Sequence, residues 1–122
     1  MTRLLIVDDD HFCCQSLSAL LGLEGFDIKT AFDGPKAIEI AKEFLPEVLI
    51  VDFMLKGELD GIQVAEILKQ SDPKIQTIVI TGHASPELVA RVKNDPSMRC
   101  LTKPAKPEQL IETVREAARR NE

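Results

Sequence analysis

The stretch Val48-Leu49-Ile50-Val51-Asp52 decides the fold of this 122-residue chain. Successive apolar residues of this kind predict a strand that is buried on both faces, as in a parallel sheet covered by helices. The aspartate that follows them would lie at the carboxyl end of the strand, where open α/β sheets bind their ligands. Asp52 is therefore the first candidate functional residue.

Other apolar runs in the chain are also followed by polar residues. These are Asp8 and Asp9 after residues 4–7, Thr81 after residues 78–80, and Lys103 after residues 100–102. Because the carboxyl ends of parallel strands share one edge of a sheet, we expect these side chains to meet there. Core packing does not call for acids, a hydroxyl and a lysine at such positions, so the set indicates a functional site.

Apolar runs alternate with helical periodicity along the whole chain. Strands are predicted at residues 3–7, 27–31, 47–51, 75–80 and 98–102, and the alternating pattern of 27–31 is typical of an edge strand. Apolar positions at helical spacing predict a helix after each strand: Cys13, Leu17, Leu20 and Leu21; Ala37, Ile38 and Ala41; Val64, Ile67 and Leu68; Leu88, Val89 and Val92; and Leu110, Ile111, Val114, Ala117 and Ala118. Together they predict one domain, residues 1–122, of the doubly wound α/β class with a five-stranded parallel sheet and five helices.

The composition limits the classes of function. The chain is 44% apolar and 29% charged, as in a globular domain, and its net charge of −5 argues against nucleic-acid binding. It contains no apolar run of membrane-spanning length and no signal-peptide pattern. The cysteines Cys13, Cys14 and Cys100 lack metal-type spacing, so we expect reduced thiols in a cytoplasmic protein, with Cys13 in the core.

The candidate residues share a chemistry. Clustered carboxylates repel one another unless a cation neutralises them, and Mg²⁺ prefers such oxygen ligands together with phosphate oxygens. A lysine opposite the acids can pair with a carboxylate in the empty site and with a phosphoryl oxygen in the filled one. A threonine hydroxyl can donate to the same phosphoryl group. The set therefore predicts Mg²⁺-dependent phosphoryl transfer onto a carboxylate.

The ordered motifs Ile6-Val7-Asp8-Asp9-Asp10, Asp52 after an apolar strand, Thr81-Gly82 and Lys103-Pro104 resemble the receiver domain of two-component response regulators. The resemblance spans nearly the whole chain. It implies the strand order 2-1-3-4-5 and a cis peptide bond before Pro104. It also implies a role for each residue: Asp52 as the phosphoacceptor, Asp8, Asp9, Asp52 and the backbone carbonyl of Met54 around Mg²⁺, Thr81 as the switch hydroxyl, and Lys103 as the lysine that pairs with the phosphoryl group.

The resemblance further implies a function in signal transduction. Asp52 would accept a phosphoryl group from the phosphohistidine of a sensor histidine kinase or a histidine phosphotransfer protein, and a surface for an unknown downstream protein would switch. The chain would not be an enzyme beyond assisting its own phosphotransfer and autodephosphorylation, and it would bind neither nucleic acid nor membrane. It is expected to be a stand-alone regulator or a receiver from a longer protein, such as a hybrid kinase.

Some positions depart from the family pattern. Lys56 stands where the family usually has proline, and Cys100 stands where many members have a tyrosine or phenylalanine that reorients on activation. Ala105 also replaces a common aromatic residue. We expect these changes to spare the phosphorylation chemistry and to alter its coupling to an output surface.

Two other classes of function would require features that differ from this pattern. A phosphatase of the haloacid dehalogenase type would use Asp8 and Asp10 as an acid-x-acid pair, but it needs a further acidic pair after its lysine, where only a helix is predicted here. A receiver fold that serves only as an unphosphorylated docking module would be marked by loss of an acid or of the lysine. None of these residues is lost, so the phosphoacceptor interpretation is favoured.

Overall fold

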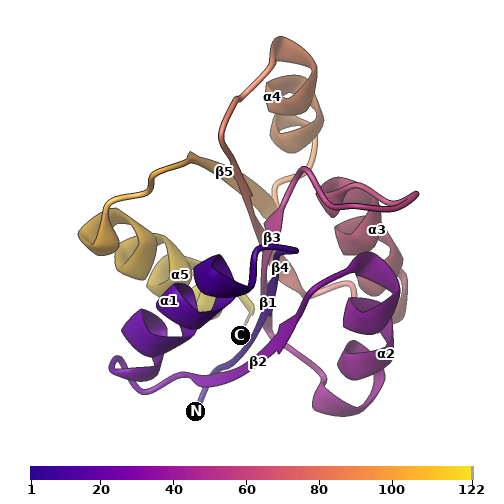
Figure 1. Cartoon of the computed structure of the whole chain (residues 1–122). Helices are drawn as coiled ribbons and strands as arrows, with labels where there is room; N and C mark the ends of the chain where they lie inside the picture. The colour runs from indigo at the N-terminus through magenta and orange to yellow at the C-terminus, as the bar shows by residue number, and fades with distance from the viewer. Residues whose placement is uncertain (122) are drawn as a thin grey trace.

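Five parallel strands alternate with five helices in a computed structural model that describes residues 1–121 (Figure 1). The strands are β1 (Arg3–Val7), β2 (Asp27–Ala31), β3 (Val48–Asp52), β4 (Gln76–Thr81) and β5 (Met98–Thr102). The helices are α1 (His11–Gly22), α2 (Gly34–Phe44), α3 (Gly61–Ser71), α4 (Pro86–Lys93) and α5 (Pro107–Asn121). The sheet has the order β2-β1-β3-β4-β5, which confirms the predicted class, the predicted order and the edge position of β2.

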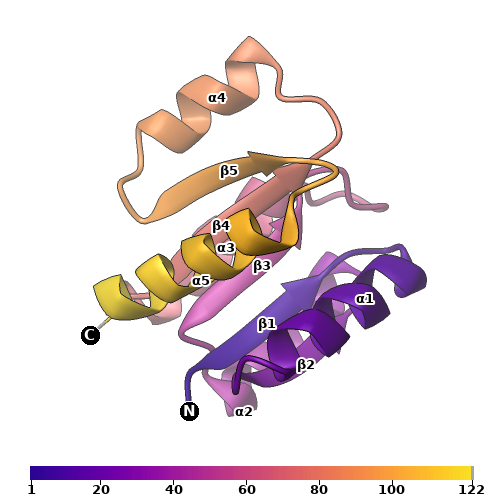
Figure 2. The ribbon, with the colours of Figure 1, turned by 90° about the vertical axis from the view of Figure 1, so that its left-hand side faces the viewer.

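Helices cover both faces of the sheet, with α1 and α5 on one side and α2, α3 and α4 on the other (Figure 2). The side chains of β1 and β3 alternate between these two layers. Leu5, Val7, Leu49 and Val51 face α2 and α3, whereas Leu4, Ile6, Val48 and Ile50 face α1 and α5. Each of these side chains is at most 1% exposed. Burial on both faces is the physical reason for the uninterrupted apolar runs.

The strand register aligns the candidate residues. Val7 of β1 lies beside Val51 of β3, so the acids that follow them, Asp8 and Asp52, leave the sheet side by side. Thr81 ends β4, the strand next to β3 on its other side. This edge of β1 and β3 is the topological switch point of the sheet, where such folds bind ligands.

Side-chain caps determine where the helices begin. The carboxylates of Asp10 and Asp33 and the hydroxyl of Ser85 accept backbone N–H groups at the starts of α1, α2 and α4. Asp60 begins α3 with a capping box, in which Asp60 and Gln63 each accept the other's backbone N–H at 2.8 Å. The caps at Asp10 and Asp60 start α1 and α3 directly beside the strand ends.

The core cysteine of α1 is Cys14, so the prediction for Cys13 was wrong. Cys14 is 1% exposed and packs with Leu21, which lies two helical turns further along, and its thiol donates to the backbone carbonyl of Asp8 at 3.3 Å. Cys13 is half-buried at the side of the helix. Among residues 1–121, no helix is long and apolar enough to cross a membrane.

Candidate functional site

Three carboxylates meet at the carboxyl edge of the sheet. Oxygen atoms of Asp8, Asp9 and Asp52 all lie within 4.8 Å of one another. Asp8 is 3% exposed and the other two are partly buried, so the cluster has one side open to the solvent. Oxygen donors in this arrangement could hold a metal ion, and a small hard cation is the kind that they fit.

Lys103 brings the opposite charge to this cluster. Its ammonium group lies 3.1 Å from Oδ2 of Asp8 and 3.0 Å from Oδ2 of Asp52. Burial alone would lower the pKa of Lys103, but the hydrogen bonds to Asp52 and Asp8 outweigh it and raise the pKa above its ordinary value. The lysine therefore stays charged at neutral pH. Three carboxylates still face one ammonium group, which leaves negative charge for a cation to neutralise.

The loop after β5 positions this lysine. The backbone N–H of Lys103 donates to the carbonyl of Thr81 at 2.7 Å, and the following bond to Pro104 is cis, as the resemblance implied. These features place the side chain across the end of β4, which lies between β3 and β5 in the sheet.

Backbone groups of the β3–α3 loop hold the acids from another side. The N–H of Met54 donates to Oδ1 of Asp52 at 3.1 Å, and the N–H of Lys56 donates to Oδ2 of Asp9 at 3.2 Å. Sequence reasoning did not find these donors, because every residue except proline carries the same backbone N–H. Lys56 supplies this N–H at the position where the family usually has proline, which could not donate. The role of the Met54 carbonyl as a metal ligand stays a prediction.

The first residue of α3 lies against the backbone of Asp52. A Cβ atom on Gly61 would come within 2.4 Å of the Asp52 carbonyl oxygen and 3.0 Å of the Phe53 Cα. The N–H of Gly61 donates to the Phe53 carbonyl at 3.0 Å, and the N–H of Phe53 donates to the Ile80 carbonyl at 2.9 Å. The peptide after Asp52 is thus held between α3 and β4, and glycine is needed because nothing larger fits.

Thr81 lies at the same edge, but its hydroxyl is bonded within its own loop. The hydroxyl donates to the carbonyl of His83 at 3.0 Å and accepts the N–H of His83 at 3.2 Å, and Thr81 is only 1% exposed. Asp10 is turned away from the cluster, because its carboxylate accepts the N–H groups of Phe12 and Cys13. This use of Asp10 as a cap removes the acid-x-acid pair that a haloacid dehalogenase would need.

Thiols beside the cluster are held in the protonated form. Burial is the largest cause that raises the pKa of Cys13 and of Cys14 to about 11, and the neighbouring Asp8 carboxylate raises both further. Burial also raises the pKa of Cys100. None of these thiols is therefore a reactive thiolate at neutral pH.

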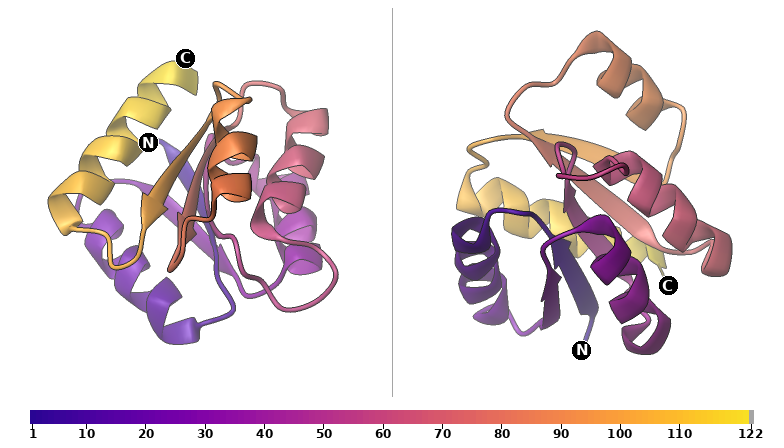
Figure 3. Two further views of the ribbon diagram at one scale, coloured as in Figure 1. Left: turned by 90° about the horizontal axis from the view of Figure 1, so that it is seen from above. Right: turned by 45° about the vertical axis from the view of Figure 1, so that its right-hand side comes forward.

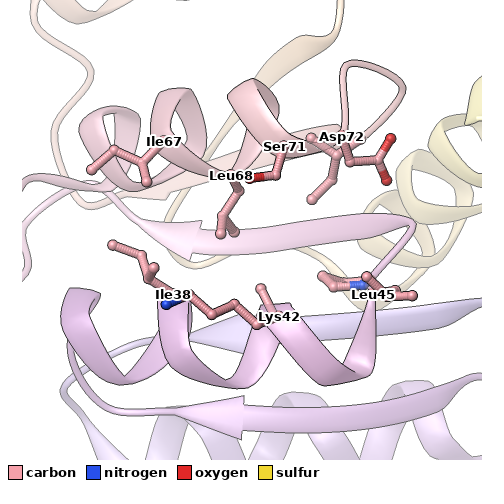
Figure 4. Close-up of a pocket in the computed structure, with 10 residues that line it drawn as sticks. Ile38, Lys42, Leu45, Ile67, Leu68, Ser71 and Asp72 are labelled. Carbon is pink, nitrogen blue, oxygen red and sulfur yellow. The ribbon is translucent and has the colours of Figure 1, made fainter.

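The surface has one hollow beside the acidic cluster and another at the opposite end of the sheet. A groove of about 400 Å³ runs between α1 and the β5–α5 loop and is lined by Phe12, Cys13, Leu17, Lys103 and Ala105, among others. A second hollow of about 280 Å³ separates α2 from α3, with Ile38 on one wall and Ile67 and Leu68 on the other (Figure 4). The second hollow also contacts Ile75, just before β4 begins, so it lies at the far end of the sheet from the acidic cluster.

Relatives at the sequence level are response regulators. Residues 4–115 match the sequence profile described as the response regulator receiver domain. The DNA-binding response regulator MtrA of Mycolicibacterium smegmatis is 32% identical over 120 residues, which cover 98% of this chain and 52% of that protein. A putative NtrX-like response regulator of Rickettsia typhi is 32% identical over 114 residues, which cover 93% of this chain and 24% of that protein. The chain thus spans about half the length of MtrA, or less in the NtrX-like protein.

Solved structures agree with this grouping. The receiver domain of the Francisella response regulator 1452 superposes with a TM-score of 0.88 and 27% identity, with 100% of both chains covered. The chemotaxis protein CheY4 of Vibrio cholerae gives a TM-score of 0.87 and 26% identity, with 96% of this chain and 98% of that chain covered. The family profile, the relatives and the shared fold together show that the chain belongs to the receiver domains of two-component response regulators.

Proposed function

We propose that Asp52 accepts a phosphoryl group from the phosphohistidine of a sensor histidine kinase or a histidine phosphotransfer protein. The observation that carries this proposal is the position of its carboxylate, which shares the Lys103 ammonium group with Asp8 at the open edge of the sheet. Both carboxylate oxygens of Asp52 are oriented, one by Lys103 and the other by the N–H of Met54. A nucleophile held in this way has little orientational freedom left to lose in the reaction.

The chemical step exchanges one bond to phosphorus for another. A carboxylate oxygen of Asp52 forms the new bond, the bond from phosphorus to the donor imidazole nitrogen breaks, and that nitrogen keeps the electron pair. Lys103 is placed to donate to a phosphoryl oxygen once it leaves its carboxylate partners. Mg²⁺ held by Asp8, Asp9, Asp52 and the Met54 carbonyl would offset the negative charge of the acids and of the phosphoryl oxygens.

Thr81 would connect the reaction to the rest of the molecule. To donate to a phosphoryl oxygen on Asp52, its hydroxyl has to give up the hydrogen bonds that it makes with His83. The loop between β4 and α4 would then lose a local constraint and change its conformation. Such a change would present a different surface to a downstream protein.

The same function implies a cellular location and an upstream partner for the chain. The chain would act as a phosphoacceptor rather than as an enzyme on an external substrate, in the cytoplasm, with a histidine kinase or phosphotransfer protein as its upstream partner. The name of MtrA describes that relative as DNA-binding. Co-purification with the tagged protein would identify its upstream partner.

Labelling by a small phosphodonor tests the acceptor. The protein incubated with acetyl phosphate and Mg²⁺ should gain the mass of one phosphoryl group, whereas Asp52→Asn should not. Asp10→Asn is the matched control, because asparagine also caps helices and Asp10 lies outside the cluster. Labelling that persists in Asp52→Asn, or that is absent from the wild-type protein, would refute the assignment.

A further inference from the structure

Helix α4 is connected to the end of β3 through Arg91. Its guanidinium group donates to Oδ2 of Asp60 at 3.1 Å, and its Cζ lies 5.9 Å from the centre of the Phe53 ring. The same group lies 3.9 Å from a carboxylate oxygen of Glu66 on α3. A planar cation over an aromatic face, with a carboxylate at its edge, is a geometry that lysine cannot reproduce.

Both main contacts of Arg91 lie next to the proposed acceptor. Phe53 is the residue directly after Asp52, and its backbone N–H and carbonyl are bonded to Ile80 and Gly61. Asp60 caps α3 with Oδ1 while Oδ2 accepts from Arg91, so one carboxylate joins two helices. Because Gly61 is packed directly against Asp52, a shift of this cap would move the peptide that carries the acceptor.

Polar contacts join both ends of α3 to the last turn of α4 and to the loop after it. Far from the acids, Lys69 of α3 donates to both carboxylate oxygens of Asp95 at 2.8 and 2.9 Å and to Ser97 at 2.8 Å, just after α4. Near the acids, the tie between the helices is Arg91. Figure 3 shows α3 and α4 as neighbours on the same side of the sheet. Arg91 therefore adds a polar contact to the apolar layer that α3 and α4 share, and this contact lies at the Asp52 end of α3.

We propose that Arg91 is a positioning residue for Asp52, which acts through Phe53 and Asp60 and makes the acceptor geometry depend on the position of α4. The proposal rests on the proposed function of Asp52. It gives this chain a connection between the acceptor and α4 that does not pass through Cys100 on β5. Because a coupling between two sites is reciprocal, a phosphoryl group at Asp52 would in turn change the environment of Arg91.

The test compares Arg91→Gln with Lys93→Gln, which removes the same charge from the same helix at an exposed position, away from Asp60 and Phe53. In the unliganded protein, Arg91→Gln should shift the amide resonances of Asp52 and Phe53, and Lys93→Gln should leave them in place. With acetyl phosphate and Mg²⁺, Arg91→Gln should lower the saturating labelling rate about 5-fold without changing the donor concentration at half-saturation. Arg91→Lys, which keeps the charge but not the planar group, should restore part of the rate.

Unchanged resonances at residues 52 and 53 in Arg91→Gln, or an equal effect of Lys93→Gln, would overturn the proposal. If Arg91→Gln does not fold, Arg91→Lys carries the same comparison, and wild-type resonances and rate in that variant would equally overturn it. If the wild-type protein is never labelled while Arg91→Gln still shifts both resonances, the positioning role stands and the proposed acceptor function fails.

Discussion

The ammonium group of Lys103 lies 3.0 Å from Oδ2 of Asp52, although the two residues are 51 positions apart in the chain. The lysine follows β5 and the acid ends β3, with β4 between them. The contact therefore forms only when β3, β4 and β5 are packed side by side in the sheet. Under the proposed function, the same positive charge would pair with the carboxylates in one state and with a phosphoryl group in the other.

Removal of the lysine should destabilise the metal-free protein. The side chains of Asp8 and Asp52 are only 4% and 11% exposed, so Lys103→Met leaves two crowded carboxylates without the positive charge that pairs with them. We expect the free energy of unfolding to fall by about 1–3 kcal/mol. This loss is smaller than for a fully buried ion pair, because the lysine is partly exposed. Urea denaturation measures it, with Lys106→Met, an exposed lysine of the same loop, as the control. Equal stabilities of the two variants would contradict the prediction.

Removal of one acid should have the opposite effect on stability. Asp9→Ala relieves repulsion among the three carboxylates, so the metal-free protein should be as stable as the wild type or more stable by about 1 kcal/mol. The same variant should lose Mg²⁺ binding in a calorimetric titration, because a ligand is gone. Wild-type Mg²⁺ affinity in Asp9→Ala would show that this carboxylate is not a ligand.

Gly61 should not tolerate a methyl group. The Cβ of Gly61→Ala would meet the Asp52 carbonyl oxygen at 2.4 Å, and a backbone atom cannot move aside without a shift of the strand end or the helix. We expect a destabilisation of about 1–3 kcal/mol. Gly22→Ala in α1, where no atom outside the adjacent backbone of the helix lies within 4 Å of the added group, should instead be neutral or stabilising by up to about 1 kcal/mol. Thermal unfolding compares the two, and similar shifts would contradict the close contact.

The Lys69–Asp95 pair should make stability depend on acid pH. Burial raises the pKa of Asp95, but hydrogen bonds from Lys69 and Ser97 outweigh it and leave the pKa below its ordinary value. A carboxyl group whose pKa is lower in the folded state stabilises the fold above its unfolded pKa of about 4, and this contribution is lost as the pH falls through the folded pKa. Lys69→Met should therefore cost stability at pH 7 and less at pH 3. A difference between wild type and variant that is the same at pH 7 and pH 3 would show that the pair is not a source of the pH dependence.

Occupation of the acidic site should change the conformation of the segment after β4 rather than that of β5. Beryllofluoride with Mg²⁺ would draw the Thr81 hydroxyl away from His83 and free the loop that leads to α4. The side chain of Cys100 is too small to fill the space that Thr81 would vacate, as an aromatic ring would. Amide hydrogen exchange should therefore change at residues 82–90 with little change at residues 98–102. Changes confined to 98–102 would exclude this route.

Much of the fold was predictable because its signals are local. An uninterrupted apolar run such as residues 48–51 requires a sheet covered on both faces, and polar residues after such runs must gather at the carboxyl edge. The predicted strands differ from the observed ones by no more than one residue at either end, for example 48–52 in place of 47–51. The meeting of Asp8, Asp9, Asp52 and Lys103 follows from the same reasoning.

The tertiary structure decided what depends on neighbours distant in the sequence. The orientation of α1 on the sheet buries Cys14 rather than Cys13, a choice that adjacent identical residues cannot reveal. Backbone donors such as the N–H of Lys56 have no side-chain signature, and the close contact of Gly61 with Asp52 exists only once α3 is packed. The periodicity of side chains indicates which face of an element is buried, but only the packed chain determines which atoms it touches.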